Sequence, residues 1–169
     1  MEFLRHALRV TTSAPIEIID ITESVRTWVT ASGIRNGSLN VISLHTTARL
    51  TINERESALQ RDMVEFLTAL APSEAEYRHN RHTVDGRANA HAHLLGLFVN
   101  ASETIPIADG ALVLGAWQSI FFVELDGPRA EREVQLQLIG ERDVRVPGAC
   151  REHHVSSTRA PREHHVRTM

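Results

Sequence analysis

The sequence predicts an α+β fold in which a predominantly antiparallel β-sheet or sandwich packs against two to three helices. The later part of the chain reads as short apolar segments separated by turn dipeptides, which is typical of an antiparallel meander. Earlier segments carry apolar residues at helical spacing, so helices are expected to cover the sheet. With 169 residues, 42% of them hydrophobic, the chain is long enough for one core and too short for two.

The first part of the chain combines strands with one helix. Residues 3–12 and 16–20 have the composition of two short strands. Thr22 is positioned to cap a helix that Gly33 ends. One face of this helix carries Val25, Trp28 and Val29.

Two further strands are predicted at 39–44 and 50–52, which makes residues 45–49 a break or bulge between them. Asn53 and Glu56 have the spacing of a capping box. The helix that follows carries its apolar residues along one face: Leu59, Met63, Phe66, Leu67 and Leu70.

A long polar segment at 73–87 follows this helix and is a candidate lid. Residues 88–98 predict a short helix whose leucines and Phe98 pack against the sheet. The remaining strands are predicted at 104–107, 111–114, 117–125 and 133–139.

We expect one domain over residues 1–141 and a polar, His/Arg-rich, flexible tail over residues 142–169. The segment 151–155 recurs at 162–166, but two copies are too few for a repeat fold. The single cysteine, Cys150, lies in this tail, so neither an internal disulfide nor a thiolate metal cage is available.

Composition argues against several classes of function. A net charge of −3 gives no electrostatic reason to expect a nucleic-acid partner. All 18 basic residues are arginine, so lysine Schiff-base chemistry is excluded and arginine must bind any anion. No segment approaches the roughly 20 apolar residues that span a bilayer, and the first residues lack a signal-peptide pattern. We therefore expect a cytoplasmic protein without a membrane partner.

Two segments place chemically capable side chains within strand-like sequence. Residues 43–54 contain His45 and Glu54, and residues 114–129 contain Gln118. Polar groups that begin where an apolar strand ends are typical of a site at the edge of a sheet.

Together with His91-Ala92-His93-Leu94, these segments resemble the YjbQ-like family. The matching phrases are His45-Thr46-Thr47-Ala48, Leu50-Thr51-Ile52-Asn53-Glu54, and Leu114-Gly115-Ala116-Trp117-Gln118 leading to Asp126-Gly127-Pro128-Arg129. The resemblance covers residues 3–140. The family has Thr where this chain has Ala116, which removes a hydroxyl beside Trp117.

The resemblance implies an α+β fold, a compact homotrimer and a secondary thiamine-phosphate synthase activity. In that reaction the nitrogen of a thiazole phosphate displaces pyrophosphate from a hydroxymethylpyrimidine diphosphate. A small phosphorylated substrate is therefore the expected partner, and no organic cofactor is expected.

Within this resemblance, His45, Glu54 and His93 are the expected catalytic residues. His45 and His93 are also expected to ligate a divalent metal, Zn²⁺ or Mg²⁺, with Glu54 completing the shell or orienting a ligand. His91 is a further ligand only if its segment is extended, because residues two apart on a helix lie about 200° apart at roughly 100° per residue.

Five residues are expected to bind substrate: Thr46, Thr47, Asn53, Gln118 and Arg129. Several of these candidates also have simpler structural explanations. Asn53 and Glu54 suit the start of a helix, and Arg129 suits a solvated surface. Trp117 is predicted to pack in the core or at the trimer interface.

Three functions are consistent with these residues. The first is a thiamine-phosphate synthase-type transferase. The second is a metal-dependent phosphate-ester hydrolase, which substrate turnover would distinguish from the first. The third is a non-catalytic metal- or metabolite-binding trimer, whose ligand binding would survive loss of Glu54.

Overall fold

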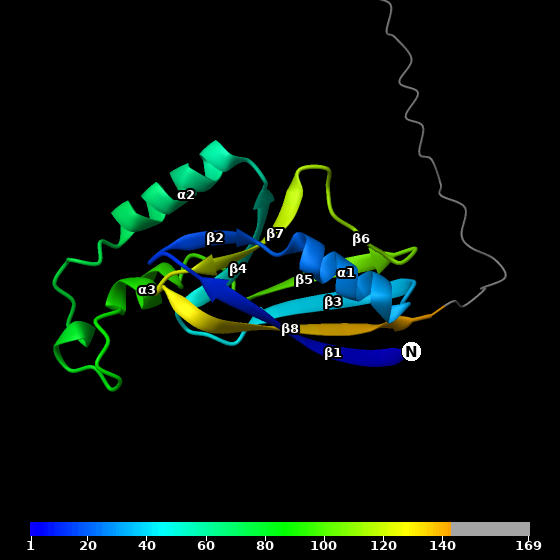
Figure 1. Ribbon diagram of the computed structural model, residues 1–169, viewed down its shortest axis with the longest axis horizontal. Helices are drawn as coiled ribbons and strands as arrows, with labels where there is room; N and C mark the ends of the chain where they lie inside the picture. The colour runs from blue at the N-terminus through cyan, green and yellow to red at the C-terminus, as the bar shows by residue number, and fades with distance from the viewer. Residues whose placement is uncertain (143–169) are drawn as a thin grey trace, which may run out of the picture.

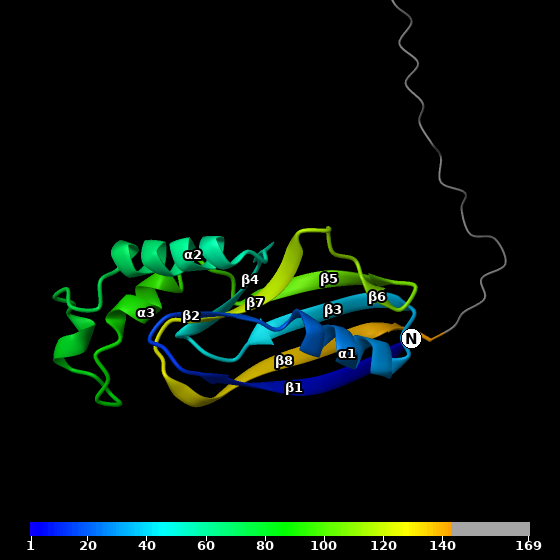
Figure 2. The ribbon, with the colours of Figure 1, turned by 45° about the horizontal axis from the view of Figure 1, so that its top comes forward.

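The computed structural model describes residues 1–142, so the predicted tail lies outside the described residues apart from Arg142, as do its repeated segment and Cys150. Within them, two antiparallel sheets and three α-helices form the expected α+β architecture (Figure 1). The helices α2 and α3 gather at one end of the molecule, and the N-terminus lies at the other (Figures 1 and 2).

The larger sheet has five strands in the order β1-β8-β3-β5-β6, and the smaller has three in the order β2-β7-β4. The strands of the larger sheet are β1 (Glu2–Thr12), β8 (Arg129–Glu141), β3 (Asn36–Ser43), β5 (Ser102–Ala108) and β6 (Ala111–Leu112). Those of the smaller sheet are β2 (Glu17–Asp20), β7 (Gln118–Glu124) and β4 (Ala48–Glu54). The break predicted between two extended pieces at 45–49 lies at 44–47 in the structure, because β4 begins at Ala48, and it is where the chain leaves one sheet and enters the other.

Three α-helices and one 3-10 turn accompany the sheets. They are α1 (Thr22–Ser32), α2 (Ser57–Leu70), η1 (His79–Arg81) and α3 (Ala90–Leu95). α1 ends at Gly33, whose φ of 71° is left-handed and suits glycine. Thr22 does not cap it as expected, because its hydroxyl accepts the backbone N–H of Ile120 from β7 instead.

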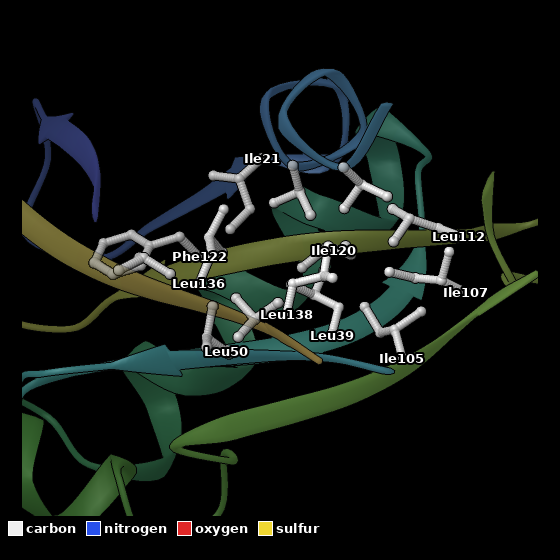
Figure 3. Packing of buried hydrophobic residues seen from close by; sticks show 14 of the residues in the cluster. Ile21, Leu39, Leu50, Ile105, Ile107, Leu112, Ile120, Phe122, Leu136 and Leu138 are labelled. Atoms are coloured by element: carbon white, nitrogen blue, oxygen red, sulfur yellow. The ribbon is translucent and has the colours of Figure 1, made fainter. Parts of the chain in front are cut away.

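The main core lies between the two sheets and under α1 (Figure 3). Leu136 and Leu138 of β8 alternate with more exposed residues, as a strand with one buried face requires. Ile120 and Phe122 face them from β7, and Val25 of α1 lies in the same cluster. The alternation recognised in the sequence therefore corresponds to the packed faces of the sheets.

The start of α2 differs from the prediction. β4 continues through Glu54 because that residue still pairs with Gln118 of β7. The helix begins at Ser57, and the Glu56 carboxylate accepts the N–H groups of Ala58 and Leu59 at 2.8 and 2.7 Å. The explanation of Glu54 as a helix-start residue is therefore wrong, since it lies in a strand.

The third helix is shorter than predicted, and part of its apolar surface is exposed. Only Ala90–Leu95 is helical, and Leu97 and Phe98 beyond it are 77% and 70% exposed instead of packed on the sheet. Trp117 is 74% exposed, so its predicted place in the core is wrong, while its place at an interface stays a prediction. No helix of the described residues is both long and apolar enough to cross a membrane.

Candidate functional site

A polar pocket of about 500 Å³ opens where the chain passes from β3 to β4. The β3–β4 connection supplies His45, Thr46 and Thr47, and α3 supplies His93. Segments distant in sequence supply the other polar groups of the wall: His79, Asp85, Arg87 and Asn89 lie between α2 and α3, Asp126 follows β7, and Arg132 lies on β8. We call this cavity the polar pocket.

His45 is held by the backbone of β8. Its Nε2 atom accepts the N–H of Glu133 at 2.8 Å, so the neutral ring carries its proton on Nδ1. Burial lowers the pKa of His45 below its usual 6.5, and the positive charge of Arg132 lowers that pKa further. His45 is therefore a neutral hydrogen-bond donor at neutral pH.

A buried ion pair forms the floor of the polar pocket. Arg132 donates from Nε to the Glu124 carboxylate at 2.7 Å and from Nη2 to the Thr47 hydroxyl at 3.2 Å. Thr12 donates its hydroxyl to the same carboxylate at 3.1 Å. The Glu124 side chain is fully buried and that of Arg132 is 7% exposed. These contacts fix the position of Thr47 and tie the β3–β4 connection to β8.

The pKa of Glu124 reflects two opposing effects. Burial raises it, but the hydrogen bonds and charge of Arg132, with the backbone N–H of Asp126 and the hydroxyl of Thr12, lower it more. The net result is a pKa below the usual 4.5. Glu124 therefore stays ionised beneath the pocket at neutral pH.

A second polar network joins the side wall to the β7–β8 turn. Asn89, which is buried, donates its amide to Asp126 at 3.0 Å and contacts His79 Nε2 through its oxygen at 3.3 Å. Nε of Arg87 lies 3.7 Å from a carboxylate oxygen of Asp85, and its Nη1 lies 3.9 Å from a carboxylate oxygen of Asp126. Both distances are longer than a hydrogen bond. The guanidinium of Arg87 can therefore turn its donors toward a ligand.

Arg129 is placed differently from the expected phosphate fork. Its Nη2 donates to Asp126 at 2.6 Å and its Nη1 to the Pro128 carbonyl at 2.9 Å. Its side chain does not line the polar pocket. Arg129 thus orients Asp126, and its direct contact with substrate stays a prediction.

The two histidines of α3 separate as helical geometry requires. His93 lines the polar pocket and packs edge-to-face with His79, with ring centroids 5.2 Å apart. His91 is buried and does not line that pocket. Because the segment is helical, the two imidazoles do not converge on one ion.

Three further predicted residues lie at the other end of the small sheet. Ala48 of β4 pairs with Glu124 near the pocket, whereas Glu54 pairs with Gln118 six residues further along. That separation is roughly 20 Å at about 3.3 Å per residue. Asn53 lies beside Glu54, and Gln118 accepts the N–H of Gly115 at 2.7 Å. Within one chain, these residues do not join His45.

The described side chains do not form a ready-made metal cage. His45 and His93 share the pocket, but no group of three or more histidine, cysteine or carboxylate side chains within residues 1–142 is arranged to hold an ion. Nε2 of His45 is also occupied by the Glu133 N–H. The arginine and imidazole donors present here suit an anion better than a resident metal ion.

Sequence reasoning did not single out Arg132, Glu124 or Asn89 as site residues. Arg132 follows a turn in a charged stretch, where a surface position is the ordinary expectation. Glu124 did carry a signal, because it is the one carboxylate in the apolar run 120–125. A charge in such a strand needs a buried partner.

Comparison with known proteins identifies the family. A model of the family described as UPF0047 protein YjbQ-like matches residues 6–141. A UPF0047 protein of Methanothermobacter thermautotrophicus is 43% identical over 141 residues, covering 83% of this chain and 95% of that protein. The UPF0047 protein YugU of Bacillus subtilis is 35% identical over 79% of this chain and 97% of its own length.

Solved structures show the same fold. A YbjQ-like protein of unknown function from Sulfolobus solfataricus has a TM-score of 0.77 at 37% identity, covering 83% of this chain and 99% of its own. A hypothetical protein from Aeropyrum pernix has a TM-score of 0.75 at 41% identity, covering 83% of this chain and all of its own. With a family model spanning most of its length and relatives this similar, the chain belongs to the UPF0047 family of YjbQ-like proteins.

Proposed function

We propose that the polar pocket binds the phosphate or diphosphate of a small cytoplasmic metabolite. The observation that carries this proposal is the convergence of Arg87 and Arg132 with three imidazoles and the Thr46 and Thr47 hydroxyls around about 500 Å³. Arginine and neutral hydrogen-bond donors are the groups that stabilise phosphate oxygens when no lysine is available.

The reaction that we propose is the thiamine-phosphate synthase type. The nitrogen of a thiazole phosphate forms a bond to the methylene carbon of the pyrimidine diphosphate. The bond from that carbon to the diphosphate oxygen breaks, and its electron pair leaves with pyrophosphate. Catalysis then requires groups that stabilise the negative charge on the leaving oxygen more strongly in the transition state than in the bound substrate.

Three pocket residues have assigned roles in this proposal. Arg87 neutralises the leaving group, since its guanidinium makes only long contacts with Asp85 and Asp126. His45 donates through Nδ1, because β8 holds its Nε2. Arg132 lies below as half of a buried ion pair with Glu124, and its Nη2 holds the Thr47 hydroxyl in place.

We also propose that the chain acts as a homotrimer. Glu54 and Gln118 lie far from His45 within one chain, so their expected roles require that a neighbouring copy bring them to the pocket. Measuring the assembly by light scattering tests this separately from catalysis.

A non-catalytic metabolite-binding trimer is the second candidate. It is favoured because two arginines at or near the pocket already pair with carboxylates of the protein. Arg132 binds Glu124, and Arg129 binds Asp126. Such pairing stabilises a fixed binding surface without demanding a reaction.

The test is turnover of the two substrates by the full chain with and without Mg²⁺, with thiamine phosphate and pyrophosphate both measured. We expect stoichiometric formation of both products. Arg87→Gln should lower kcat/KM by about tenfold or more, as loss of a charged hydrogen bond does. The matched control, Arg26→Gln on α1, removes an exposed arginine paired with Glu23 and should leave kcat/KM unchanged.

Other outcomes would reassign the function. Binding of either substrate without product would favour the non-catalytic trimer. Release of inorganic phosphate from a single substrate would favour the metal-dependent phosphate-ester hydrolase. Absence of both binding and turnover would contradict the phosphate proposal.

A further inference from the structure

A second cavity adjoins the polar pocket. Its volume is about 620 Å³, and its walls include Tyr77, Ala90 and Leu94. His79 and His93 line both cavities, so this pair of imidazoles forms a shared part of their walls. We call this space the apolar cavity.

The two cavities differ in chemistry. The polar pocket is lined by arginines, amide and carboxylate groups, while the body of the apolar cavity is carbon from Tyr77, Ala90 and Leu94. The exposed charged residues Glu76 and Arg78 also line it and carry opposite charges. The apolar cavity therefore offers no concentrated charge to an anion.

The shared wall suits a flat ring. His79 and His93 meet at an interplanar angle of 80°, so each ring keeps a face that its partner does not cover. The Tyr77 hydroxyl donates to the Pro72 carbonyl at 3.0 Å, which satisfies its polar end and holds the phenol ring in place. Fixed aromatic faces bind planar ligands by stacking at little entropic cost.

We propose that the apolar cavity binds the heteroaromatic ring of the molecule whose phosphate lies in the polar pocket. The identity of the phosphate end rests on the proposed function above. The ligand class is thus a planar heteroaromatic phosphate ester that reaches across the shared edge formed by His79 and His93, with its ring in the apolar cavity and its phosphate in the polar pocket. Paired sites of this kind, one apolar and one with convergent polar groups, together define small-molecule specificity.

The test uses three probes on the full chain: inorganic pyrophosphate, the thiazole phosphate and the phosphate-free thiazole alcohol. Leu94→Asp places a charge in the apolar cavity at a residue that is 41% exposed, so folding should survive. The matched control is Leu97→Asp, which alters an exposed leucine that lines neither cavity. Binding is measured by calorimetry, and the ring site by NMR shifts of Tyr77 and Leu94.

We expect Leu94→Asp to weaken thiazole-phosphate binding by about tenfold while pyrophosphate binding stays within about twofold. Tyr77→Ala should act in the same direction, and Leu97→Asp should change neither affinity. Circular dichroism of each variant checks that the fold is intact.

The possible failures are distinguishable. If pyrophosphate binds but the ring adds no affinity and Leu94→Asp has no selective effect, the ring site is overturned while the phosphate site stands. If pyrophosphate does not bind but the thiazole alcohol shifts Tyr77 and Leu94, the proposed function fails and the ring site stands. If none of the probes binds, both proposals fail.

Discussion

The two ends of the small sheet contrast sharply, although the same two strands form both. At one end, Glu124 of β7 is fully buried and bound by Arg132, and the polar pocket opens above it. At the other end, Gln118 begins β7 as an exposed residue beside Glu54 of β4. One end is a closed charged network, and the other is a polar surface.

This contrast shows why closeness in sequence misleads in a strand. His45 and Glu54 are separated by only nine positions and look like one group of site residues. A strand extends about 3.3 Å per residue, so β4 carries Glu54 roughly 20 Å from the pocket. Arg132, 87 positions from His45, lies in the pocket instead.

The largest expected effect comes from breaking the buried ion pair. Arg132→Leu leaves Glu124 charged and unpaired, which should lower the free energy of unfolding by about 3–5 kcal/mol. Urea denaturation measures this. Arg9→Leu is the matched control, because the side chains of Arg9 and its partner Glu131 are 71% and 57% exposed. This substitution should lower the free energy of unfolding by under about 1 kcal/mol. Equal losses in the two variants would show that the floor of the pocket is not specially stabilised.

A smaller effect should separate the two ends in binding. His45→Ala should weaken pyrophosphate binding by about tenfold or more, since it removes a donor to a charged ligand. Glu54→Ala should leave binding to an isolated chain unchanged. Calorimetry combined with light scattering provides the readout. If Glu54→Ala weakens binding only in the assembled form, the far end of one chain completes the pocket of another.

The smallest expected effect is on the pH dependence of stability. Because the pKa of His45 in the folded chain lies below 6.5, the unfolded chain binds a proton at His45 more tightly than the folded chain does. Protonation of His45 therefore favours unfolding as the pH falls. The wild type should therefore lose more stability than His45→Gln between about pH 7.5 and about pH 5.5. Glu124 contributes in a lower window, since its stabilisation is present above 4.5 and is lost as the pH falls through its folded pKa. Parallel curves for the wild type and His45→Gln would contradict the assignment.

Much of the fold could be predicted because local patterns encode it. Alternation along 133–139 identified the buried face of β8, and Gly33 identified the end of α1. The start of α2 could not be predicted in this way. Asn53 and Glu56 satisfy a capping pattern, but pairing with β7 keeps Asn53 extended, and that pairing is a tertiary contact.

The candidate site could be predicted only in part for the same reason. His45, Thr46, Thr47 and His93 were named from sequence and share one pocket. Arg132 reaches it from β8 and Asn89 from the segment before α3, which no local pattern connects to His45. Which strand ends meet is determined by sheet topology, so these residues required the structure.

The pairing of β1 with β8 determines where a label can be attached without covering the polar pocket. Glu2 lies opposite Gly140, at the end of β8 remote from Arg132. Arg132 and Glu141 are nine positions apart along β8, or roughly 30 Å at about 3.3 Å per residue. A dye or a solid support attached before Glu2 would therefore leave the pocket facing free solution, which suits surface-based binding measurements.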